Sequence, residues 1–267
     1  SYFEDEKGQP WRCLHYVPNS VCYQQVEKPE QFYQSALSFG HFLKQLGDYP
    51  AESLYETIPQ FHDTRKRFRD FEDAQRKDVK NRARLCRQEI DFVLSRKADC
   101  GVLMNQLEEG KLPLRVTHND TKLNNILFDK DTDRGLCIID LDTIMPGLAA
   151  NDFGDSIRFG ASTAEEDEQN LDKVHFDINL YDIYVKGYLE MAKDVLTPEE
   201  IKSPPWGARL MTLECGMRFL ADFLQGDVYF KTAYPEHNLV RARTQFRLVK
   251  EMEEQFDEMN EILKKYI

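Results

Sequence analysis

Apolar residues recur at helical spacing over much of the chain. Steps of four and three place one set on a single helical face: Phe32, Ala36, Phe39, Leu43 and Leu46. The same kind of spacing predicts a helix from about Gly207 to Leu224 and another helix through residues 239–263. Before these two helices, Thr197-Pro198-Glu199-Glu200 has the form of a helical capping box. The sequence therefore predicts a largely helical C-terminal half.

Short apolar runs bounded by turn residues predict strands in the rest of the chain. Residues 2–17 have the pattern of a β-hairpin with a turn at Gly8-Gln9-Pro10. A short strand is expected over residues 112–117, and a strand–turn–strand unit over residues 126–139. We expect the second strand of this unit to be buried, with Cys137 in the core. The unit carries polar residues at both outer ends, which is typical of a fold that has built a site there.

Residues 65–97 are rich in Arg and Lys interleaved with Asp and Glu. Alternating charges of this kind favour a solvated helix held by ion pairs over a phosphate-binding patch. We found no internal repeat and no low-complexity tract.

Composition and charge then narrow the class of protein. Of 267 residues, 41% are hydrophobic and 31% are charged, as in ordinary globular proteins. The formal net charge of −12 argues against nucleic acid as a partner, because phosphate backbones need a surplus of Lys and Arg. The chain contains no run of 18 apolar residues, so we predict no membrane span. Six cysteines without a CxxC pair are typical of a reducing compartment, so we expect a cytoplasmic protein.

The stretch from Thr117 to Asn125 carries the candidate chemistry. Its form is H-x-D-x-K-x-x-N, and the catalytic loop of protein kinases has the same Asp and Asn in the same relation. Phosphoryl transfer needs a carboxylate that orients the attacking hydroxyl and accepts its proton, and an oxygen ligand for magnesium nearby. Asp120 is the predicted base, with Lys122 as a second catalytic residue, and Asn125 is the predicted ligand. The alternative is a polar loop in which Asp120 is only a turn residue.

A second carboxylate follows at the expected distance. Asp140 ends the apolar strand and lies twenty positions after Asp120, as the metal-binding Asp of a kinase does. Magnesium prefers carboxylate oxygens and substrate phosphates. Asp140 is therefore the principal predicted metal ligand, and Asp142 is a second or outer-sphere ligand.

Two neighbouring features have structural interpretations. Asp152-Phe153-Gly154 spells the kinase D-F-G tripeptide, but it lies thirty-two positions after Asp120 and no apolar strand precedes it. We interpret it as a structural segment in which Asp155 braces the catalytic loop by accepting backbone hydrogen bonds. His118 is expected to be a buried, hydrogen-bonded scaffold residue rather than a base.

At these residues the chain resembles the aminoglycoside-phosphotransferase and choline-kinase superfamily, and more closely the N-acetylhexosamine 1-kinases. The segments that carry the likeness are residues 118–125, 139–147, 152–158, 214–219, 226–230 and 241–245. The resemblance implies an α+β fold: a protein-kinase-like C-terminal lobe, mainly helical with short β-hairpins, plus a remnant hairpin of the N-terminal lobe. It implies a division into residues 1–24, the last hairpin and hinge, and residues 25–267, the catalytic lobe.

The resemblance also implies a reaction. The protein would use ATP and Mg²⁺ to phosphorylate a sugar. The acceptor would be the anomeric hydroxyl of an N-acetylhexosamine. Tyr16 and Val17 of the hinge, with Asn125 and Asp140, would bind the nucleotide. Arg218 and Tyr229 would contact the sugar. The alternative role for Arg218 is an ion pair on the helix surface, and for Tyr229 it is that of a packed aromatic ring.

Other interpretations stay open. The acceptor alcohol could instead be homoserine, choline, methylthioribose or an aminoglycoside, and composition does not decide between them. A non-catalytic, kinase-like binding module is a third hypothesis. The chain starts at Ser1 and contains no Gly-rich loop and no strand Lys before its first long helix. We therefore expect a fragment that lacks most of the residues that cover the nucleotide and that binds ATP poorly.

Overall fold

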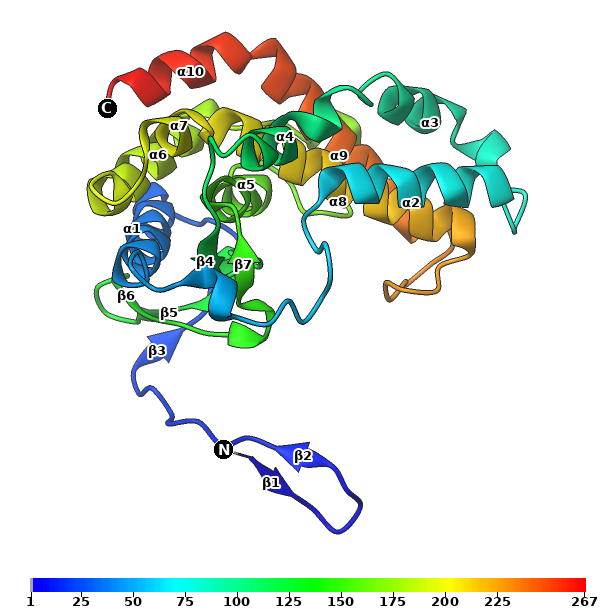
Figure 1. Ribbon diagram of the computed structural model, residues 1–267. Helices are drawn as coiled ribbons and strands as arrows, with labels where there is room; N and C mark the ends of the chain where they lie inside the picture. The colour runs from blue at the N-terminus through cyan, green and yellow to red at the C-terminus, as the bar shows by residue number, and fades with distance from the viewer. Residues whose placement is uncertain (1) are drawn as a thin grey trace.

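The computed structural model describes residues 2–267 and shows a helix-rich body that carries small antiparallel sheets (Figure 1). The α-helices are α1 (Pro29–Gln45), α2 (Thr64–Lys77), α3 (Arg87–Leu94), α4 (Val102–Glu108), α5 (Ala149–Gly160), α6 (Ile178–Ala192), α7 (Pro198–Lys202), α8 (Pro204–Gln225), α9 (His237–Glu254) and α10 (Phe256–Lys264). The strands are β1 (Phe3–Glu4), β2 (Pro10–Trp11), β3 (Ser20–Val21), β4 (Arg115–Thr117), β5 (Ile126–Asp129), β6 (Gly135–Ile138) and β7 (Met145–Gly147). The α+β class predicted from the sequence is confirmed.

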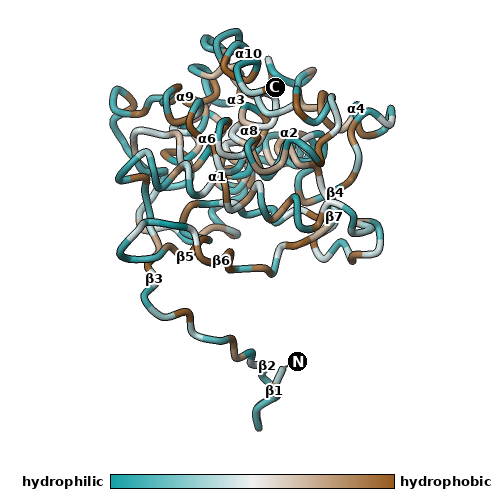
Figure 2. The backbone as a smooth tube through the Cα atoms, turned by 90° about the vertical axis from the view of Figure 1, so that its left-hand side faces the viewer, coloured by the Kyte–Doolittle hydropathy of each residue, from teal (hydrophilic) through white to brown (hydrophobic). Residues whose placement is uncertain are grey.

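The N-terminal hairpin extends away from this body as an arm (Figures 1 and 2). β1 and β2 pair antiparallel, with Phe3 opposite Trp11, so the predicted hairpin is confirmed in a shorter form. Its aromatic side chains stay in solvent, and Trp11 is 60% exposed. The arm rejoins the body at β3, which pairs with β5.

The strand–turn–strand unit forms the β5–β6 hairpin of a three-stranded sheet ordered β3-β5-β6. The prediction that its second strand is buried is wrong: Leu136 is 46% exposed and Cys137 is exposed. β6 is the edge strand, and helix α1 covers only one of its faces. The edge strand has no further strand beside it, so both of its middle residues stay accessible to solvent despite their hydrophobicity.

Helix α8 is the central element of the body. It is buried on most sides and packs against α2, α5 and α9, while α1 packs on α6. The contact between α8 and α5 is unusually close. A Cβ on Gly154 would overlap the carbonyl of Gly207, and a Cβ on Gly207 would overlap that of Ala150. The two glycines therefore allow the helix backbones to touch.

Two predicted helices are divided in the structure. The C-terminal helix expected through residues 239–263 breaks at Gln255 into α9 and α10. The charged stretch contains two helices, because α2 ends at Asp78 in a left-handed conformation (φ 35°) before α3 begins. Ion pairs such as Lys66–Asp70 line it, as predicted. The capping box at Thr197 is confirmed. No helix within residues 2–267 combines the length and apolar character that a bilayer crossing needs.

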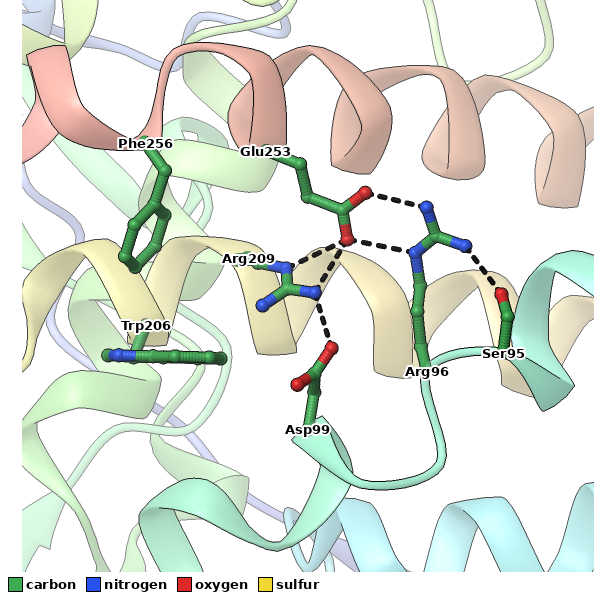
Figure 3. Close-up of a pocket in the computed structure, with 7 residues that line it drawn as sticks. All are labelled: Ser95, Arg96, Asp99, Trp206, Arg209, Glu253 and Phe256. Atoms are coloured by element: carbon green, nitrogen blue, oxygen red, sulfur yellow. Dashed lines mark hydrogen bonds and ion pairs between the residues drawn. The ribbon is translucent and has the colours of Figure 1, made fainter.

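Glu253 joins three parts of the helical body through one carboxylate (Figure 3). Arg96, which follows α3, donates to both of its oxygens at 2.8 and 2.6 Å. Arg209 of α8 donates to Oε1 at 2.9 and 2.6 Å, and also binds Asp99. Burial would raise the pKa of Glu253, but the hydrogen bonds from the two arginines outweigh it and lower that pKa.

We predict that Glu253→Gln lowers the free energy of unfolding at pH 7 by about 1–3 kcal/mol, because a charged acceptor of several hydrogen bonds is lost. A depressed carboxylate pKa stabilises the fold above the unfolded value and loses that effect as the pH falls through the folded value. The variant should therefore lose less stability than the parent on acidification below about pH 4.5. Urea denaturation across this range measures both effects. Glu254→Gln, which removes an exposed partner of Lys250, should behave like the parent.

Candidate active site

The predicted catalytic loop runs from the end of β4 to the start of β5. Its central residue, Asp120, is held by two neighbours in the same loop. The Asn125 amide donates to Asp120 Oδ2 at 3.0 Å and to its backbone oxygen at 2.8 Å. Lys122 Nζ lies 3.0 Å from Oδ1. Both carboxylate oxygens thus have fixed partners, while 26% of the side chain stays exposed. The spacing of the sequence motif does bring these three residues together.

Helix α5 fixes the backbone of this loop. Asp152 accepts the backbone N–H groups of His118 and Asn119, both at 2.8 Å. Asp155, one turn later, accepts the N–H of Thr121 at 2.9 Å, which confirms the predicted brace. Sequence reasoning gave Asp152 no specific role. The i, i+3 spacing of the two aspartates, which places them on one helical face, was the available signal.

The environments of these two carboxylates differ. Burial raises the pKa of Asp152, whose nearest donors are backbone amides. Burial also tends to raise the pKa of Asp155. Attraction to Arg158 and Lys122 outweighs this effect, so the pKa of Asp155 is lowered. Arg158 Nε donates to Asp155 at 2.9 Å and Arg158 also contacts Glu166. Asp155 is therefore a stable anion beside the catalytic loop.

His118 has the scaffold role expected from the sequence. Its ring is fully buried against Phe39 and Phe42 of α1. Nε2 lies 3.0 Å from the carbonyl oxygen of Ile139, the residue before Asp140. The histidine thereby ties the catalytic loop to the chain that leaves β6.

The three predicted metal ligands are placed differently. The N–H of Ile139 donates to the carbonyl of Asn125 at 2.9 Å, so Asp140 lies beside Asn125 where the two strands meet. The NH₂ group of Asn125 is used by Asp120, and within residues 2–267 its side-chain oxygen has no hydrogen bond. Asp142 instead pairs with Arg12 at 2.5 Å. Oxygen donors from Asn125 and Asp140 fit a hard cation such as Mg²⁺.

Asp120 opens into a cavity of about 500 Å³ between the catalytic loop, α5, α8 and the segments around residues 61 and 231. Its charged lining residues are Asp120, Lys122, Asp155, Arg158, Glu166, Glu214, Arg218, Lys231 and Arg241. The structure thus places Arg218 in the same cavity as Asp120 and Lys122. Asp140 is exposed beside Asn125 and does not line this cavity.

Arg218 is oriented by aromatic rings rather than by acids. Its guanidinium lies 5.4 Å from the ring centre of Phe61, 5.5 Å from Phe230 and 6.0 Å from Tyr229. Among the described residues, no hydrogen bond or ion pair engages it, so the surface ion pair considered from the sequence is absent there. Tyr229 is 70% exposed and lines a neighbouring cleft of about 410 Å³. It is neither a packed core ring nor a wall of the cavity at Asp120.

The cavity also contains residues that sequence reasoning did not single out. Phe61 and His62 enter from the segment before α2, and Arg158 comes from α5. Phe61 and His62 lie in no recognisable motif, whereas Arg158 ends the segment 152–158 that carries the family likeness. Cys215 is a further lining residue, and burial raises the pKa of its thiol to about 11.

The two predicted hinge residues lie where the arm rejoins the body. Tyr16 is 82% exposed, and the carbonyl of Val17 accepts a hydrogen bond from Ser20 Oγ at 2.7 Å. Neither side chain lines the cavity at Asp120.

Comparison with known proteins gives the family. A family model described as the phosphotransferase enzyme family matches residues 3–189, which include the whole catalytic loop and α5. The chain belongs to this family. Within the matched residues lie Asp120, Asn125, Asp140 and the two bracing aspartates, whereas Arg218 lies beyond them.

Solved structures of kinases share the fold of this phosphotransferase. A choline kinase from Cryptosporidium parvum is similar with a TM-score of 0.55 at 14% identity, over 94% of this chain and 73% of that chain. An ethanolamine kinase from Plasmodium vivax is similar with a TM-score of 0.50 at 15% identity, over 86% of this chain and 64% of that chain. This chain therefore spans about two thirds to three quarters of their length.

We predict that Asp152→Asn lowers the free energy of unfolding of the phosphotransferase by about 1–3 kcal/mol, because two buried N–H groups lose an acceptor that can serve both. Thermal or urea denaturation followed by circular dichroism measures the loss. Asp172→Asn changes an exposed aspartate and should leave stability unchanged. Equal stability of the two variants would contradict the bracing role.

Proposed function

We propose that this protein transfers the γ-phosphoryl group of ATP, with Mg²⁺, to a hydroxyl group of a small neutral acceptor, and that this acceptor is a sugar. The observation that carries the proposal is the Asp120 carboxylate, fixed by Asn125 and Lys122 and open to a cavity of about 500 Å³. Cavities of roughly 300–1,000 Å³ suit small-molecule ligands. Membership of the phosphotransferase family supports the reaction class.

In this proposal Asp120 orients the acceptor hydroxyl and accepts its proton as the new P–O bond forms. Lys122, 3.0 Å from the carboxylate, supplies positive charge near the transferred group. Asn125 and Asp140 would hold the magnesium ion, which neutralises charge on the phosphates. Asp142, which Arg12 already engages, would act as a second or outer-sphere ligand.

The nucleotide would lie over the junction of β5 and β6 and reach the arm. Tyr16 and Val17 are the proposed contacts for the base, because they occupy the connection between the hairpin and the catalytic lobe. The exposed ring of Tyr16 supplies an apolar surface for the base.

The charges in the cavity support a neutral, oxygen-rich acceptor. Its positive side chains outnumber its carboxylates, and each of the four carboxylates already has a partner, which argues against a cationic acceptor. A choline-like cation needs aromatic faces, but Arg218 already occupies those of Phe61, Tyr229 and Phe230. The unpaired N–H groups of Arg218 can instead donate to hydroxyl or amide oxygens. An N-acetylhexosamine, phosphorylated at its anomeric hydroxyl, carries both kinds of oxygen and is the acceptor we propose.

We predict that Asp120→Asn lowers the rate of phosphoryl transfer by about 100-fold or more, because the general base is lost. A coupled assay of ADP release measures the rate over a panel of N-acetylhexosamines, choline, homoserine, methylthioribose and aminoglycosides. Asp131→Asn, on the exposed turn after β5, should keep the parent rate. Full activity of Asp120→Asn would contradict this assignment and favour a different base or a non-catalytic role.

We also predict that Arg218→Met raises the KM for the sugar by about tenfold or more, because charge-assisted hydrogen bonds to the acceptor are lost. The KM for ATP should be unchanged. Methionine keeps an unbranched stem against the three rings, which limits collapse of the site. Arg76→Met removes an exposed arginine that pairs with Asp73 and is the matched control. An unchanged sugar KM in Arg218→Met would exclude the proposed contact.

A further inference from the structure

His62 stands between the acceptor cavity and the catalytic loop. Only 7% of its side chain is exposed. Nδ1 lies 2.8 Å from Oε1 of Glu214, and Nε2 lies 3.2 Å from the carbonyl oxygen of Asn119. We propose that His62, supported by Glu214, is a positioning residue that sets the orientation of Asp120 and links it to occupancy of the acceptor cavity. This inference rests on the proposed function of Asp120.

The bond to Asn119 acts on the peptide unit that leads into Asp120. The carbonyl of Asn119 and the N–H of Asp120 belong to one planar group, so holding the carbonyl fixes the plane from which Asp120 projects. Asn119 is itself in a left-handed conformation, with φ 63°. Its N–H donates to Asp152 at 2.8 Å and its side-chain amide donates to the carbonyl of Thr143 at 2.9 Å. His62 supplies the remaining restraint, on the carbonyl.

The hydrogen-bond chemistry explains why a histidine is suited to this place. Asn119 offers only a carbonyl acceptor, so Nε2 must carry a proton to bind it. Glu214 also accepts from Thr64 Oγ1 at 3.0 Å and is fully buried. Both contacts are satisfied when the ring carries two protons beside an ionised Glu214, or when Glu214 carries one of them.

The surroundings of the ring are charged on several sides. Asp152 and Asp155 of α5 interact electrostatically with His62, and Arg67 of α2 interacts with Glu214 of α8. Two acids and one arginine therefore face the His62–Glu214 pair.

The same segment forms a wall of the acceptor cavity. Phe61 and His62 both line it, with ring centres 4.3 Å apart. The Phe61 ring also lies under Arg218, and its carbonyl is held by Arg67 at 2.6 and 3.0 Å. An acceptor bound to Arg218 would rest against this segment. His62 therefore connects the acceptor cavity to the loop that carries Asp120.

The test compares His62→Phe and His62→Gln in the full chain, with acceptor and ATP varied separately. We expect His62→Phe to lower kcat by roughly 10- to 100-fold, the cost of a misplaced catalytic group. The KM for ATP should change by less than about threefold, since His62 lies on the acceptor side. Glutamine can still donate one N–H to Asn119, so His62→Gln should recover part of the lost kcat.

His175→Phe is the matched control. The His175 ring faces the same kinds of acceptor, Glu251 Oε1 at 3.0 Å and the carbonyl of Asp172 at 2.9 Å. It lies outside the cavity and is 48% exposed. This variant should keep the parent kcat. A parent-like kcat per folded molecule in His62→Phe, with a lower melting temperature, would show a merely structural role and overturn the proposal.

Hydrogen exchange gives a readout that does not depend on activity. The amides of residues 118–121 should exchange faster in His62→Phe than in the parent and in His175→Phe, because the loop loses its restraint at Asn119. Unchanged exchange there would overturn the proposal. If the parent phosphorylates no acceptor in the panel, the proposed function fails, and the exchange rates still decide whether His62 positions the loop.

Discussion

The active-site architecture depends on two buried carboxylates that accept backbone N–H groups. Asp152 and Asp155 project from one face of α5 and engage the loop at His118, Asn119 and Thr121. Such bonds specify the backbone path rather than a side chain, and burial makes them costly to break. Helix α5 can supply them only because it lies directly against α8, where glycines remove the side chains between the two backbones.

Around that rigid loop, the site divides into two sides with different chemistry. On the β5–β6 side, Asn125 and Asp140 lie where the strand ends meet, and we propose that their side-chain oxygens hold a cation and its phosphates. On the α8 side, the cavity presents guanidinium and ammonium groups, and aromatic rings orient Arg218. Asp120 lies between them, so a hydroxyl in the cavity and a phosphoryl group over the strands would meet at its carboxylate.

The restraints on the loop come from segments that are distant in the sequence. His118 reaches the chain after β6, His62 reaches Asn119 from the segment before α2, and Glu214 supports His62 from α8. Each is a short contact between buried polar groups, so each must find a partner when the body folds. The geometry of the catalytic loop therefore depends on how the helices pack.

Local patterns determined much of this protein from the sequence alone. Helical spacing predicted α1 and α8, the capping box predicted the start of α7, and motif spacing brought Asp120, Lys122 and Asn125 together, because contacts within a few residues follow from local geometry. Tertiary structure decided the rest. The exposure of β6, the break at Gln255, the separation of Tyr229 from the acceptor cavity and the role of His62 all depend on what packs against each segment. Burial and long-range hydrogen bonds arise from neighbours remote in the chain, and no local pattern encodes those neighbours.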